Sequence, residues 1–135
     1  MFVKYNHASD VPEDEYLSNE EVYQLHSILV DHANEILSNT QSAMNELTES
    51  QAIEPDELDV ALSESNRELS LRFADRERRM LQKIQFTISR VADGEYGSCE
   101  ECGEPIGFRR LRSRPVATMC IDCKTAEEQL ERKSR

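Results

Sequence analysis

Two closely spaced pairs of cysteines constrain this chain more than any other feature of its sequence. Each pair has the spacing C-x2-C, 17 residues separate the pairs, and the four residues are Cys99, Cys102, Cys120 and Cys123. A two-residue spacer folds into a tight knuckle that points both sulfurs inward, so two knuckles can bind one tetrahedral Zn²⁺ as thiolates. Four thiolates leave no coordination position open for water. The pattern therefore predicts one structural zinc ion and no catalysis at the metal.

Disulfide bonds and a redox-active dithiol are two other common uses of such pairs. The chain starts without the basic residues and apolar stretch of an export signal, which argues against an oxidising compartment. A redox-active C-x-x-C is expected near a βαβ pattern, and the sequence has none. A zinc-thiolate redox sensor, in which oxidation ejects the metal and loosens the fold, remains an open alternative because four thiolates permit it.

A long amphipathic segment begins at Ser18, which forms a capping box with Glu21. Its apolar residues recur at steps of three, four and seven, which is the pattern of a narrow seam for one partner helix. They are Val22, Leu25, Leu29, Ile36, Ala43 and Leu47. His26 and His32 lie on different faces of this helix, so we expect packing or solvated histidines and no metal site there.

A second segment with the same pattern follows the helix breaker Pro55, where we expect the chain to turn back. Its seam consists of Leu58, Leu62, Leu69, Phe73, Met80, Ile84, Ile88 and Val91. Two i,i+4 ion pairs are expected on its exposed face, Glu68 with Arg72 and Asp75 with Arg79. Gly94 is expected to end this helix.

These patterns predict an all-α fold: a long antiparallel two-helix coiled-coil hairpin, a small four-cysteine zinc-finger globular base and a short C-terminal helix. Helices of about 32 and 37 residues make a rod roughly 45 to 55 Å long at about 1.5 Å per residue. The expected organisation is an N-terminal segment (residues 1–17) that docks around Tyr5 and Tyr16, a hairpin (18–94) with its tip near 50–60, and a zinc finger with the C-terminal helix (95–135). We expect that last helix, Thr125–Lys133, to pack on the base.

Acidic residues are spread unevenly along the chain. From Met1 to Asn66 there are 15 acidic residues against the single Lys4, and from Arg67 to Arg135 there are 12 acidic residues against 15 basic ones. An acidic first half is repelled by a phosphate backbone, so we expect no direct DNA binding and a protein partner instead. No apolar run approaches the roughly 20 residues that a membrane span needs. We therefore expect a cytoplasmic protein with no membrane contact. We also expect a monomer.

Charged residues gather at both ends of the predicted rod. Near the tip, Asp56 and Asp59 stand beside Ala61, and carboxylates on a thin rod can meet a Mg²⁺ shell, a basic side chain or a backbone amide inside another molecule. They fit a cap for the second helix equally well, since acids favour a helix N-terminus. Cations crowd the predicted base: Arg109, Arg110, Arg112 and Arg114, joined in the same half by Arg76, Arg78, Arg79, Lys83 and Lys124. Arginine forks suit phosphates and carboxylates, while a solvated surface is the alternative.

Several stretches of the sequence resemble one known family. They are DELDVA at residues 56–61, RFADRERRML at 72–81 and YGSCEECGEPIGFRRLRSRPVATMCIDCK at 96–124. Together they are similar to the DksA/TraR family of bacterial RNA polymerase regulators. The chain length and the position of EDEYL at residues 13–17, before the first helix, point to the full-length branch of that family.

The resemblance implies a non-enzymatic factor that binds RNA polymerase and inserts its coiled coil through the secondary channel. With ppGpp, such a factor destabilises open promoter complexes, represses ribosomal RNA promoters and favours amino-acid biosynthesis promoters. The family's tip motif D-x-x-D-x-A falls on Asp56, Asp59 and Ala61. Its alarmone contacts match Arg76, Lys83, Arg114 and Lys124, with Glu131 near that site.

The tip departs from the family pattern in ways typical of a divergent member or a paralogue. Val60 stands where the familiar tip has arginine, and residues 62–67 differ from the acidic run that usually follows. An alternative function for acidic residues at such a tip is help with transcript cleavage, as in Gre-like channel factors, through a Mg²⁺ held by Asp56 and Asp59.

Overall fold

The structure, a computed structural model, describes the backbone at residues 1–50 and 57–134 and the side chains at residues 1–43 and 64–134. Its elements are η1 (Ala8–Asp10), α1 (Asn19–Ser50), α2 (Glu57–Ala92), α3 (Phe108–Ser113) and α4 (Ile121–Lys133). In this part of the chain, the one strand-like pairing is an isolated bridge between Ser98 and Pro105. The all-α prediction is therefore confirmed.

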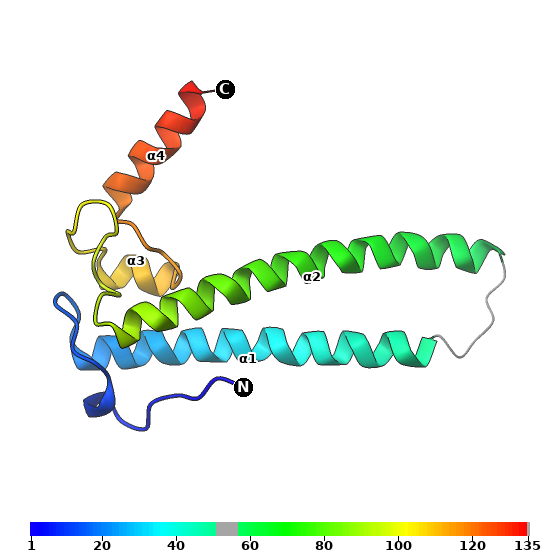
Figure 1. Cartoon of the computed structure of the whole chain (residues 1–135), viewed down its shortest axis with the longest axis horizontal. Helices are drawn as coiled ribbons and strands as arrows, with labels where there is room; N and C mark the ends of the chain where they lie inside the picture. Colours follow the sequence, from blue (N-terminus) through cyan, green and yellow to red (C-terminus); the bar gives the residue numbers. More distant parts are fainter. Residues whose placement is uncertain (51–56, 135) are drawn as a thin grey trace.

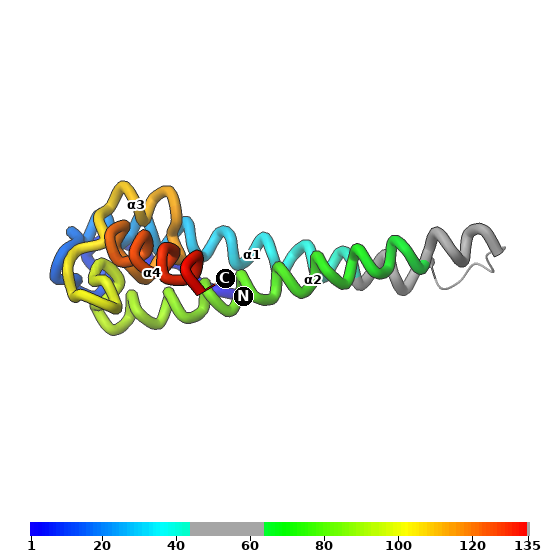
Figure 2. Tube along the Cα trace, turned by 90° about the horizontal axis from the view of Figure 1, so that it is seen from above, coloured from blue at the N-terminus to red at the C-terminus, as the bar shows by residue number. Residues whose placement is uncertain are grey.

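The two long helices form the antiparallel hairpin that the seam pattern predicts. α1 and α2 lie side by side and carry the base, with α3 and the cysteine loops, at one end (Figure 1). Figure 2 shows that the rod is thin from the other side as well. With 32 and 36 residues, the helices match the expected lengths. The predicted turn at Pro55 and Asp56 lies outside the described residues, and the domain boundaries stay predictions.

Local hydrogen bonds explain where the two long helices begin and end. The Ser18 amide donates to Oε1 of Glu21 at 2.9 Å, and the Glu21 amide donates to Oγ of Ser18 at 3.2 Å, so the capping box is confirmed. At the end of α2, Gly94 has a φ of 75°. The amides of Gly94 and Glu95 reach back to the carbonyls of Val91 and Arg90, at 3.1 and 3.0 Å. This Schellman arrangement confirms Gly94 as the residue that ends the helix.

The core lies where the hairpin meets the base. Side chains from α1, α2, α3, the N-terminal segment and the cysteine loops pack into one cluster there. Among the buried members are Val11, Leu17, Val22, Leu25, Leu29, Ile36, Ile84, Val91, Tyr96, Ile106 and Leu111. Burial of this apolar surface stabilises the end of the molecule that also holds the cysteines.

The predicted seam is wrong over the outer part of the rod that the structure describes. Leu69 and Phe73 are 53% and 64% exposed, and Ala43 is exposed as well. Away from the base each helix has only the other for cover, and residues 38–43 of α1 are all exposed there. A period-seven pattern thus marks a face of the helix but does not ensure its burial.

Two further predictions are corrected by the structure. α4 begins at Ile121, four residues earlier than expected, and it has no buried residue. It projects away from the base (Figure 1), so the expected packing of Thr125–Lys133 is wrong. The pair Glu68–Arg72 forms at 2.9 Å, but Asp75 bonds Arg78 at 3.2 Å instead of Arg79. An i,i+3 partner is as close on a helix surface as an i,i+4 partner.

The N-terminal segment docks on the base, as expected, and does so at several points. The Tyr5 and His26 rings lie 4.5 Å apart between centroids. Phe2 and Asn34 exchange two hydrogen bonds, at 3.1 and 3.2 Å, and Lys4 pairs with an exposed aspartate of α1 at 2.7 Å. The first residues are thus held against α1. No helix in the described part of the chain is long and apolar enough to span a membrane.

Candidate functional site

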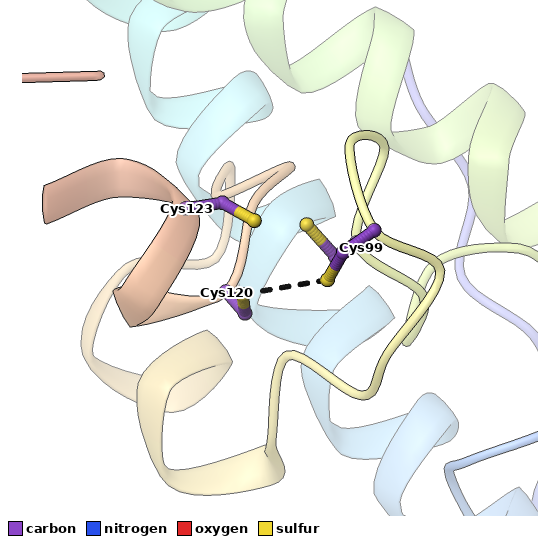
Figure 3. Close-up of side chains that lie close together, drawn as sticks. Cys99, Cys120 and Cys123 are labelled. Carbon is purple, nitrogen blue, oxygen red and sulfur yellow. Dashed lines mark hydrogen bonds between the residues drawn. The ribbon is translucent and has the colours of Figure 1, made fainter. Parts of the chain in front are cut away.

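The four cysteines converge at the base on one point. Their sulfur atoms all lie within 4.8 Å of one another, and Cys102 and Cys120 are 3.8 Å apart between Sγ atoms. Tetrahedral zinc with Zn–S bonds of about 2.3 Å requires sulfurs about 3.8 Å apart. Figure 3 shows the sulfurs of Cys99, Cys120 and Cys123 turned toward one another. All four are free thiols, so the donor set fits one structural Zn²⁺.

Backbone hydrogen bonds shape the first knuckle and join it to the second. In the first, the Gly103 amide donates to the Cys99 carbonyl at 3.0 Å, with Gly103 at a φ of 74°. The Glu100 amide donates to the Thr118 carbonyl at 2.9 Å, which ties the two cysteine loops together. Cys120 is the N-cap residue of α4. The C-x2-C spacing and a left-handed glycine thus produce the metal-binding shape.

The thiols influence one another because they are so close. Burial opposes ionisation of Cys99, but backbone amides of Cys102, Cys120 and Glu101 donate to its sulfur and bring its pKa down to about 6. Hydrogen bonds that the Cys123 thiol donates to the sulfurs of Cys120 and Cys102 raise the pKa of Cys123. One thiolate therefore forms readily while further ionisation is opposed. A dication removes this opposition, since it lowers the energy of every thiolate at once.

A second feature is a cavity of about 640 Å³ between the hairpin and the base. Its apolar lining includes Ile28 of α1, Phe86 of α2 and Met119 of the cysteine loop. Five lining residues carry or can carry positive charge: His32, Lys83, Arg110, Arg114 and Lys124. The cavity is therefore suited to an anionic ligand that also has an apolar surface.

Three of the four cations that the family resemblance assigned to the alarmone line this cavity together. They are Lys83 from α2, Arg114 from the residue after α3, and Lys124 from α4. Arg76 is exposed on α2 and is not part of the lining, and Glu131 is exposed near the end of α4. These five assignments stay predictions.

Hydrogen bonds position two of the cavity cations. Lys124 Nζ donates to Oε2 of Glu127 at 2.9 Å, and this bond, with the charge of Glu127, raises the pKa of Lys124. Nε of Arg110 donates to the Met119 carbonyl at 3.0 Å. The sequence placed Arg110 in a basic run that suits phosphates and carboxylates, but it gave no specific site for Arg110 and no ligand role for His32. Their only sequence signal was charge, and the fold decides which charges meet.

The predicted tip is described only in part. Asp59 and Ala61 fall within the first turns of α2, whose backbone is described, while their side chains and all of Asp56 lie outside the described residues. The tip assignment therefore stays a prediction.

The geometry defines a class of protein: a two-helix rod with a four-cysteine zinc finger at its base. Comparisons with known proteins agree with this class. Residues 21–91 match the family described as DnaK suppressor protein DksA, N-terminal domain, and residues 94–129 match the prokaryotic dksA/traR C4-type zinc finger.

Comparison with individual relatives identifies the family more specifically. The RNA polymerase-binding transcription factor DksA of Escherichia coli K12 is 38% identical over 117 residues, which cover 87% of this chain and 78% of the relative. DksA of Caulobacter vibrioides is 38% identical over 131 residues, covering 97% and 90%. The structure of DksA2 from Pseudomonas aeruginosa superposes with a TM-score of 0.78 at 35% identity, covering 93% and 95%. The chain belongs to the DksA family of RNA polymerase-binding transcription factors, which are not enzymes.

Proposed function

We propose that this protein binds RNA polymerase through the secondary channel and, together with ppGpp, destabilises open promoter complexes. It would thereby repress ribosomal RNA promoters and favour amino-acid biosynthesis promoters. Support comes from family membership and from relatives named as RNA polymerase-binding factors. The target is a protein surface, and the acidic first half of the chain argues against direct DNA binding.

One observation carries the proposal, namely the reach of the rod. Helices of 32 and 36 residues extend about 48 and 54 Å at about 1.5 Å per residue. The buried core and the cysteine cluster lie at one end, so that end can dock while the other enters a narrow passage. Asp59, in the first turn of α2, and Asp56, three residues earlier in the sequence, would then act at a point distant from the docking surface.

The cationic cavity is the proposed site for ppGpp at the polymerase interface. Lys83, Arg114 and Lys124 line it together, and the alarmone's phosphates need several cations at once. Arg76 would approach from the adjoining surface of α2 when the polymerase completes the site, with Glu131 nearby. The zinc ion holds the base in shape and takes no part in chemistry. We further propose a cytoplasmic monomer.

Transcription by purified polymerase tests the proposed function directly. Initiation from a ribosomal RNA promoter is measured with and without the protein, and with and without ppGpp. We expect inhibition that ppGpp increases. Unchanged initiation in the presence of saturating protein and ppGpp would contradict the proposal, and shortened RNA in backtracked complexes would favour the transcript-cleavage alternative.

A substitution at the tip tests whether polymerase binding and inhibition of initiation depend on different parts of the protein. We expect Asp59→Asn to abolish inhibition of the promoter while polymerase binding is nearly unchanged, because the tip acts on the enzyme and the base provides the docking. Glu64→Gln is the matched control, since Glu64 is an exposed acid on the same helix. Binding is measured by competition with labelled wild-type protein. Equal loss of binding and inhibition by Asp59→Asn would refute the separation of tip and base.

A further inference from the structure

The N-terminal segment is bonded to the loop that carries the first two cysteines. Oδ2 of Asp14 accepts a hydrogen bond from the Gly97 amide at 2.9 Å, and Oδ1 accepts one from the Tyr16 amide at 3.0 Å. The Tyr16 hydroxyl donates to the Gly103 carbonyl at 2.9 Å. These contacts hold the loop just before Cys99 and just after Cys102. The first knuckle is therefore gripped on both sides by residues more than 80 positions earlier in the chain.

The fit between the segment and the loop is close. A Cβ atom at Gly97 would lie 2.6 Å from Oδ1 of Asp14 and 3.0 Å from Cγ of Leu17. One at Gly94 would lie 2.5 Å from the Glu13 carbonyl oxygen. Both glycines thus leave room for the segment. On the other side of the chain, the Gly97 carbonyl accepts a bond from Ile106 at 2.9 Å, so the loop is bonded at both of its faces.

Two buried side chains anchor the segment beside these polar contacts. Val11 and Leu17 are 5% and 7% exposed and belong to the same cluster as Cys99 and Cys120. Cys102, in contrast, is exposed. Competing ligands can therefore reach the metal site most easily at the first knuckle. Release of a metal from that side requires the knuckle to move, and the segment opposes that movement.

We infer that residues 11–17 form a strap that retains the zinc ion by holding the first knuckle in its bound shape. Asp14 and Tyr16 are positioning residues in this inference, since neither contacts the metal. In this inference zinc release begins with outward movement of Cys102, because that cysteine is exposed. Each strap bond makes this opening rarer, so loss of the strap accelerates zinc release without altering the four ligands.

Zinc transfer from the full-length, zinc-loaded protein to a chromogenic chelator tests the inference. We expect Asp14→Ala to speed zinc release by about tenfold, the factor that corresponds to about 1.4 kcal/mol for a lost charge-assisted hydrogen bond. Tyr16→Phe, which removes one neutral hydrogen bond, should speed it by about threefold. The matched controls are Asp10→Ala and Tyr23→Phe, whose side chains make no hydrogen bond within the described part of the chain. They should leave the rate unchanged.

A general loss of stability must be distinguished from loss of the strap. Ile84→Val reduces packing in the same core at a residue of α2 and leaves every strap residue unchanged, and it should leave zinc release within twofold of wild type. Amide hydrogen exchange at Gly97, followed by NMR, should accelerate in Asp14→Ala and not in Ile84→Val. Wild-type release rates in both Asp14→Ala and Tyr16→Phe, or equal acceleration by Ile84→Val, would overturn the inference. If Asp14→Ala fails to fold, Tyr16→Phe alone decides the result.

Discussion

Replacing Tyr96 by Phe should destabilise the protein near neutral pH and lose that effect at high pH. The Tyr96 side chain is fully buried, and its hydroxyl donates to the Pro115 carbonyl at 2.6 Å. Removal of the donor leaves that carbonyl without its partner, which costs about 1–2 kcal/mol. For a chain of this size the melting temperature should fall by roughly 3–8 °C.

The dependence on pH follows from the direction of the pKa shift. Burial raises the pKa of Tyr96 above its ordinary value, so the folded state keeps the neutral phenol at a pH where the unfolded state ionises it. The stability that this tyrosine contributes is fully present below about pH 10 and is lost as the pH rises further. At pH 11 the unfolded state gains about 1.4 kcal/mol from ionisation. The difference between wild type and Tyr96→Phe should therefore shrink toward zero.

Urea unfolding followed by circular dichroism at pH 7 and pH 11 measures both effects. The comparison uses the difference between the two proteins, because contributions common to both cancel in it. Tyr23→Phe is a suitable control, since Tyr23 makes no hydroxyl hydrogen bond within the described residues. A variant as stable as wild type at pH 7, or a difference that stays constant up to pH 11, would refute the reasoning.

Two further predictions test the described core. Leu111→Ala should cost about 2–4 kcal/mol of unfolding free energy because the leucine of α3 is fully buried. Leu69→Ala should cost less than about 1 kcal/mol because its side chain is 53% exposed. Equal costs of the two substitutions in urea titrations would contradict the finding that Leu69 is not a buried seam residue. Burial lowers the pKa of His26, so stability should fall as the pH drops below about 6.5, where the unfolded histidine takes up a proton. His26→Leu should reduce this loss of stability at low pH. An unchanged dependence of stability on pH in the variant would contradict the prediction.

The parts of the fold that the sequence determined by itself depend on short-range patterns. Ser18 and Glu21 are three residues apart, and their reciprocal hydrogen bonds form wherever a helix starts there. Gly94 ends α2 because a left-handed residue is needed at that point. Each C-x2-C pair points its two sulfurs the same way because a knuckle is a local shape, and a hydrogen bond from the Glu100 amide to the Thr118 carbonyl then joins the two pairs. In the capping box, in the helix end and within each knuckle, the partners lie only a few residues apart.

Features that depend on contacts between distant segments came only from the tertiary structure. The heptad pattern marked Leu69 and Phe73 as seam residues, but burial needs cover from a second surface, and a two-helix rod has little. A count of arginines and lysines did not reveal which of them share a cavity, because α2, α3 and α4 meet there only in the folded state.

The strap is the clearest example of a feature that the sequence alone does not predict. Asp14 and Gly97 are 83 residues apart, and each looks ordinary in its own stretch of sequence. Their hydrogen bond forms because packing in the core places the N-terminal segment and the cysteine loop at the same end of the hairpin. Patterns of period two, three or four in the sequence reflect interactions between residues that are close along the chain. Which surfaces then meet is decided by the packing of the whole molecule.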